Sequence, residues 1–184
     1  MTNPTAANVL VASPLSTGGV LTADYGTTLP TTPTASTAAF TATGYISEDG
    51  VTLTVDRSTQ DVFAWGGQKV RNIQTDSSVQ IALGFLETTP TVLSTVFGED
   101  NVSTVGDVTT VSITGGVLPQ FALVIDAADG DKRVRITAAA AQIISQEDLV
   151  FVHSAPTIYN VTIECFPDAN GVNAKLLYEE DYDS

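Results

Sequence analysis

The chain has 184 residues, the size of one domain with a sizeable core. Hydrophobic residues make up 43% of it, and threonine and valine are abundant, a composition that favours strands. Seven basic against twenty-one acidic residues give a net charge of −14, which argues against ordinary binding of DNA or RNA. No apolar stretch approaches the ~20 residues of a membrane helix, and no basic residue precedes Arg57, so we expect neither membrane insertion nor a targeting signal.

The first 40 residues contain little charge and much threonine, alanine, proline and glycine. Residues 27–39 include two prolines and are typical of a loop, whereas the segment from Gly19 has the residues of a short strand. The apolar side chains of Val9, Leu10 and Val11 favour an extended N-terminal arm that orders against a neighbouring subunit. A flexible terminus is the alternative.

Alternation of apolar and polar residues predicts strands over 51–57 and 79–85, each with one face on the core. The Asp49-Gly50 step before the first of them predicts a tight turn after a strand over 41–47. The period then changes to that of a short helix over about 89–97. Thr88 or Thr89 is its N-cap, Pro90 its first residue and Gly98 its stop.

The alternation weakens between Arg57 and Ile73, around the sequence Trp65-Gly66-Gly67. A lone tryptophan beside two glycines either caps the edge of the core or projects from an exposed loop as an interface anchor. The basic residues Arg57, Lys69 and Arg71 also lie here, three of the seven in the chain. They favour salt contacts with the acidic surface of another copy.

The ordered set of residues in this region resembles the major tail tube protein of long-tailed bacteriophages with non-contractile tails. The similarity is close over less than a third of the chain. The matching residues are Gly44-Tyr45, 47–51, 56–59, Asp61, Ala64-Trp65-Gly66-Gly67, Val70-Arg71, 75–76, 86–88, Leu93 and 96–98.

This resemblance implies a mainly β fold, a two-sheet β-sandwich or barrel with one short helix. A single domain over 41–178 would follow the N-terminal arm of residues 1–40 and precede an acidic tail over 179–184. The implied function is structural: self-assembly into stacked hexameric rings that form a hollow tail tube. The implied interface residues are Arg57, Asp61, Trp65, Gly66, Gly67, Lys69 and Arg71, together with Val9, Leu10 and Val11.

The resemblance also implies partners and a location. The partners are further copies of the chain, a tape-measure protein, and the tail tip and tail terminator proteins. Phage DNA would pass through without specific binding, since six copies carry a charge of −84. The location would be the virion tail, after assembly in the host cytoplasm. Two alternatives are the tube protein of a contractile tail or secretion machine, and a β-sandwich binding module such as a virion adhesin or receptor-binding domain.

The second half of the chain continues the β pattern. A polar loop is expected over 99–106, then strands over 108–114, 121–126, 159–166 and 174–178. Residues 138–144 fit either a helix or the end of a strand. The basic residues Lys132, Arg133 and Arg135 are expected to pair with nearby aspartates.

No combination of residues indicates catalysis. His153 is the only histidine and has no nucleophile motif beside it, and Cys165 is the only cysteine, expected to be a buried, inert thiol. One histidine and one cysteine are too few for a usual zinc site, and no phosphate-binding loop is present. We therefore expect no enzymatic activity, no metal and no cofactor.

Overall fold

The computed structural model describes residues 9–15 and 18–180. Its strands form a nine-stranded sheet in the order β3-β2-β8-β9-β10-β5-β4, with β1 paired to β8 and β11 paired to β9. The remaining two strands, β6 and β7, pair only with each other. The strands are β1 (Ser13–Pro14), β2 (Val20–Asp24), β3 (Thr41–Ala42), β4 (Ile46–Phe63), β5 (Lys69–Phe85), β6 (Val102–Val105), β7 (Val108–Val111), β8 (Phe121–Asp129), β9 (Lys132–Gln146), β10 (Tyr159–Phe166) and β11 (Lys175–Glu179). The mainly β class is therefore confirmed, with the sheets not closed into a barrel within one chain.

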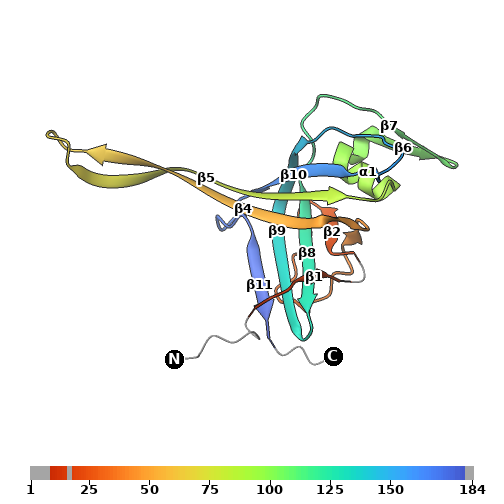
Figure 1. Ribbon diagram of the computed structural model, residues 1–184, viewed down its shortest axis with the longest axis horizontal. Coiled ribbons are helices and arrows are strands. Elements are labelled where there is room, and N and C mark those ends of the chain that lie inside the picture. The colour runs from red at the N-terminus through yellow and green to blue at the C-terminus, as the bar shows by residue number, and fades with distance from the viewer. Residues whose placement is uncertain (1–8, 16–17, 181–184) are drawn as a thin grey trace.

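The long strand β9 connects the two halves of the large sheet. One edge of β9 pairs with β8, and the other edge pairs first with β11 and then with β10. The connection over 167–174 separates these two partners. Figure 1 shows β4, β5 and β10 running across the view while β8, β9 and β11 run down it. The change of direction at β9 leaves a gap in hydrogen bonding between the β4–β5 pair and β11.

The predicted helix is confirmed as α1 (Pro90–Phe97). The Thr89 hydroxyl accepts a hydrogen bond from the Val92 N–H at 3.3 Å, and the helix stops at Gly98, where φ is 89°. Val92, Leu93 and Val96 bury their side chains against the large sheet in the main core. Each such burial contributes about 1.5–3 kcal/mol. A short 3-10 turn, η2 (Glu99–Asn101), follows.

A second strand pair extends from this end of the molecule. β6 and β7 form a hairpin whose two-residue turn is Gly106-Asp107, with Gly106 at φ 61°. The expectation of a polar loop over 99–106 was therefore wrong. The strand over 108–114 is also shorter than expected, because β7 ends at Val111. The hairpin has only four residues on each side, too short for its alternation to stand out in the sequence.

A buried ion pair holds the N-terminal segment against the sheet. Arg135 on β9 donates through Nε and Nη2 to both carboxylate oxygens of Asp126 on β8, the Nη2 bond being 2.8 Å. Its Nη1 also donates to the backbone carbonyls of Thr32 at 3.0 Å and Ala35 at 2.8 Å. The predicted pairing with a nearby aspartate is thus confirmed for Arg135. Residues 138–144 are a continuous part of β9, which resolves that alternative.

The turn predicted at Asp49-Gly50 was wrong, because these residues form a bulge inside β4. Ile46 pairs with Phe85 and the next pair is Val51 with Leu83, so four residues of β4 lie opposite one of β5. Gly50 has a φ of 72°. A glycine-containing bulge and a type I′ hairpin turn both use a residue with positive φ, so an Asp-Gly step is compatible with either one. No helix among the described residues is long and apolar enough to cross a membrane.

Candidate subunit interface

The paired strands β4 and β5 form a hairpin that extends well beyond the body of the molecule (Figure 1). Its base is anchored by β10, which pairs with β5 from Gln80 to Phe85. Beyond Gln80, β5 pairs only with β4 among the described residues, and the ribbon continues to the pair Phe63 and Lys69. A two-stranded ribbon alone in water is marginally stable. Nothing else in the described part of the chain covers this outer part.

The exposed apolar side chains of this hairpin change face along its length. Near the base, Leu53 and Val55 share a face with Ile81 and Val79 across the strand pair. Thr75 has no partner on β4, and this bulge puts Ile73 opposite Gln60, on the same face as Val62. Val62 and Ile73 therefore lie on the face opposite to Leu53 and Val55, whereas the exposed Phe63 near the tip lies on the same face as Leu53 and Val55.

The tip of the hairpin is the Trp65-Gly66-Gly67 turn. The Trp65 side chain is fully exposed. The N–H of Gly67 donates to the carbonyl of Ala64 at 3.0 Å, and the N–H of Ala64 donates to the carbonyl of Gln68 at 2.8 Å. Gly66 and Gly67 have φ values of 115° and 85°, which side-chain-bearing residues rarely adopt. The glycines thus fix a turn that holds the tryptophan in solvent.

A small polar network stiffens the hairpin just below this turn. Asp61 accepts hydrogen bonds from Lys69 Nζ at 2.7 Å and from Asn72 Nδ2 at 2.6 Å. The Lys69 ammonium, and then the Asn72 amide, hold the pKa of the Asp61 carboxyl below its usual range. Lys69 and Asp61 therefore contact each other within one chain. Arg57 and Arg71 have no ion-pair partner among the described residues.

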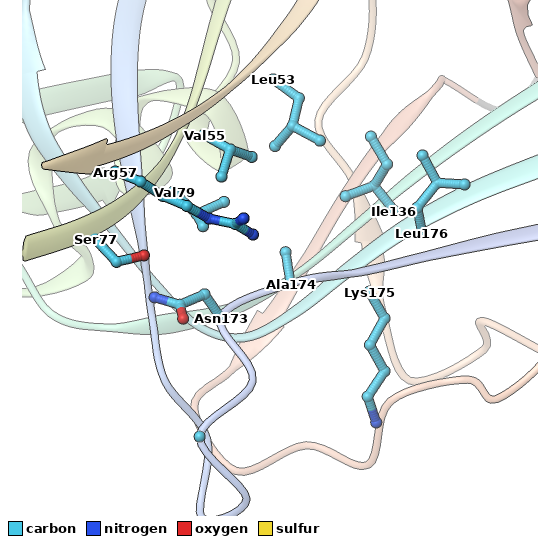
Figure 2. Close-up of a pocket in the computed structure, with 11 residues that line it drawn as sticks. Leu53, Val55, Arg57, Ser77, Val79, Ile136, Asn173, Ala174, Lys175 and Leu176 are labelled. Atoms are coloured by element: carbon cyan, nitrogen blue, oxygen red, sulfur yellow. The ribbon is translucent and has the colours of Figure 1, made fainter. Parts of the chain in front are cut away.

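The base of the hairpin and strand β11 enclose a groove of about 380 Å³. Figure 2 shows its two sides, with Leu53, Val55 and Val79 facing Ile136 and Leu176 across the gap. Arg57 extends into the gap alongside Val79. Lys175, from β11, also lines the groove. We call this surface the β4–β11 groove; it combines apolar side chains with the polar Ser77 and Asn173 and one cation, Arg57, inside the gap.

The groove was not predicted from the sequence. The alternation over 51–57 predicts a core face, but Leu53 is 37% exposed and Val55 is 50% exposed. Leu176, opposite them, is 61% exposed. Alternation shows that residues share a face but not whether the same chain covers that face. No signal in the sequence distinguishes the two cases.

The N-terminal residues expected at an interface lie elsewhere on the molecule. Val9, Leu10 and Val11 are exposed, and the Val11 N–H donates to Asp129 Oδ2 at 2.9 Å at the β8–β9 turn. β1 then pairs with β8 through Ser13 and Pro14. The expected interface residues are therefore divided between two places, the hairpin and this strip. Within the arm expected over 1–40, residues 20–24 form β2 in the large sheet.

Residues with possible reactivity are isolated from one another. His153 lies in an exposed loop, and Cys165 is buried on β10. Burial, with a smaller effect of Glu164, raises the pKa of the Cys165 thiol to about 11, so it stays neutral. Among the described residues, no group of three or more His, Cys, Asp or Glu side chains is placed to hold a metal.

The sequence as a whole matches a family model described as phage tail tube protein, over residues 2–182. The chain therefore belongs to the phage tail tube protein family, a structural class. No curated protein matches it significantly.

The chain is also similar to chains of three solved structures. A chain from the tail of an empty gene transfer agent particle, refined with C6 symmetry, is 14% identical; the match covers 78% of this chain and 88% of that one, with a TM-score of 0.41. A chain of the anti-feeding prophage tube-terminating cap is 12% identical. The match covers 95% of this chain and 98% of that one, with a TM-score of 0.46. A chain of the PVC sheath–tube complex, an extracellular contractile injection system, is 9% identical. The match covers 97% of this chain and 99% of that one, again with a TM-score of 0.46. The family assignment rests on the sequence match.

Proposed function

We propose that copies of this chain assemble into stacked hexameric rings that form the hollow tail tube of a long-tailed, non-contractile phage. The observation that supports this most directly is the β4–β5 hairpin, whose outer half is exposed on both faces and ends in a solvent-exposed tryptophan. Tryptophan and arginine dominate the binding energy of protein interfaces. The hairpin residues Arg57, Asp61, Trp65, Gly66, Gly67, Lys69 and Arg71, with the strip Val9, Leu10 and Val11, are the proposed contacts.

The role proposed for the assembled tube is to carry DNA without binding it. A ring of six copies has a net charge of −84, and acidic groups on the channel wall repel a polyanion that passes close to it. The tube would start on a tail tip, reach a length set by a tape-measure protein and be closed by a terminator. Assembly would take place in the host cytoplasm and leave the chain in the virion tail.

Negative-stain electron microscopy of the purified protein tests this proposal. We expect hollow tubes or stacked rings from the wild type at high protein concentration. A matched variant replaces residues 61–72 by Asn-Gly, which joins the paired residues Gln60 and Ile73 through a two-residue turn. This variant should keep the thermal unfolding transition of the body and form no tubes.

Two results would count against the proposal. Normal tubes from the shortened variant would show that the outer hairpin is not a contact. Small particles of uniform size from the wild type, at every concentration and salt level, would favour the binding-module alternative. An outer surface that binds a sheath protein would instead favour the tube of a contractile tail.

A further inference from the structure

We infer that the β4–β11 groove receives the β6–β7 turn of a second copy, with Asp107 of that copy pairing with Arg57. The inference rests on the proposed self-assembly, and it identifies two surfaces that contact each other between copies. Both surfaces are exposed in the isolated chain, and they differ in shape and in charge.

The groove lacks a partner of a particular chemistry. Apolar side chains on both sides share the groove with the polar Ser77 and Asn173. Arg57 within it has no carboxylate at ion-pair distance among the described residues. The Lys175 side chain points away from the gap (Figure 2), so Arg57 is the cation that an occupant would meet. A guanidinium covered by an interface without a counter-charge would be strongly destabilising. The occupant must therefore bring apolar side chains and a carboxylate together.

The β6–β7 turn offers this combination. Val105 and Val108 are directly paired, so their side chains lie next to each other on one face of the hairpin, and they are 80% and 65% exposed. Asp107 lies between them in the turn, with no ion-pair partner among the described residues. The two-residue turn makes this end of the hairpin narrow. Figure 1 places it at the end of the molecule opposite to the β4–β5 tip.

The other exposed apolar segments fit less well. The strip containing Val9, Leu10 and Val11 has no acidic residue between positions 9 and 15. Asp61, beside the exposed Phe63, already accepts from Lys69 and Asn72. Glu87, near Tyr45, accepts the Tyr45 N–H at 2.9 Å. Asp24 beside Tyr25 and Asp148 near Phe151 remain as the competitors that an experiment has to exclude.

The proposed contact also has the symmetry that assembly requires. A projection at one place and a groove at another form a heterologous contact, in which each copy uses two different surfaces. Repetition of such a contact gives a ring when the rotation closes and a filament when it does not. A self-complementary contact would stop at a dimer.

A charge-exchange series tests the pairing. Arg57→Asp and Asp107→Arg should each reduce tube formation at least about tenfold, because each puts two like charges at the contact. The double variant Arg57→Asp/Asp107→Arg should recover tube formation to within about threefold of the wild type. Both positions are exposed, so the circular dichroism and thermal unfolding of all three variants should be unchanged.

Two matched controls keep the same net charge as the double exchange. Arg57→Asp/Asp24→Arg and Arg57→Asp/Asp148→Arg should not recover assembly. Two results would overturn the assignment of the β6–β7 turn to the groove. One is tube formation restored by either control, and the other is tube formation not restored by Arg57→Asp/Asp107→Arg.

Cross-linking gives a second readout. Leu176→Cys and Val108→Cys chains, mixed and oxidised, should give a disulfide dimer on a non-reducing gel, whereas each alone should not. The wild type is the negative control, because its cysteine, Cys165, is buried. Tubes without the cross-link or the rescue would overturn this inference while leaving the proposed function standing. The absence of any oligomer from the wild type would overturn both.

Discussion

The interaction between Arg135 and Asp126 shows how one residue organises a distant segment. The guanidinium donates from two nitrogens to the carboxylate of Asp126. Its third nitrogen donates to the carbonyls of Thr32 and Ala35, about a hundred positions earlier in the chain. Both charged side chains are buried. Removing one member of such a pair leaves the other charge buried without compensation.

We therefore expect Asp126→Ala to lower the free energy of unfolding by about 3–5 kcal/mol. Urea unfolding followed by circular dichroism measures this loss. Segment 31–36 should also become susceptible to limited proteolysis, since its anchor is the arginine that the aspartate orients. Lys69→Ala, which breaks the exposed pair with Asp61, is the matched control and should change stability little. Equal losses from the two variants would contradict the role given to the buried pair.

At the scale of the strand and the hairpin, bulges decide the direction in which exposed side chains point. A bulge bends the strand that contains it and increases the local twist. Thr75 is the unpaired residue of the bulge in β5, and its hydroxyl donates to the Ser58 carbonyl at 3.2 Å across the hairpin. The orientation of the Trp65 tip relative to the body therefore depends on a residue far from the tip.

Deleting Thr75 should preserve every strand pair on both sides of the bulge while redirecting the tip. We expect thermal unfolding of the body to remain close to wild type and tube formation to fall strongly in negative-stain images. Thr75→Val is the matched control, because it keeps the bulge and removes only the hydroxyl bond. Tubes of normal diameter and length from the deletion variant would show that the orientation of the hairpin is not important.

The same bulges explain how far the fold could be predicted. Regular alternation made the strands over 51–57 and 79–85 predictable, and the Thr89 cap with Pro90 made α1 predictable. In the outer hairpin the alternation alone does not indicate strands, because skipped partners at Thr75 and Val70 break the period of two. The interface candidates Trp65, Gly66 and Gly67 could be selected by residue type. The β4–β11 groove could not, because its members lie far apart in the sequence and resemble core residues.

At the scale of the whole molecule, the chain has a central body with two hairpins projecting toward opposite ends (Figure 1). The longer hairpin and the shorter β6–β7 hairpin both leave apolar side chains exposed in the single chain. Assembly through two different surfaces accounts for both projections in one arrangement, whereas a monomeric binding module leaves them without a role.

Charge opposes this assembly, which leads to a prediction about salt. Copies of charge −14 repel one another over about 30 Å at 0.01 M ionic strength but over only about 3 Å at 1 M. The charges of an ion pair in direct contact are about 3 Å apart, which is no more than the screening length at 1 M. Salt therefore weakens such a pair less than it weakens the repulsion between whole chains. Tube growth, followed by light scattering and checked by negative stain, should therefore accelerate as salt rises. The variant Asp49→Asn/Asp148→Asn/Glu180→Gln, which removes three exposed charges, should assemble at lower salt than the wild type. Growth that slows with salt would instead mean that ion pairs between copies, rather than the apolar surfaces of the hairpins and the groove, supply most of the attraction.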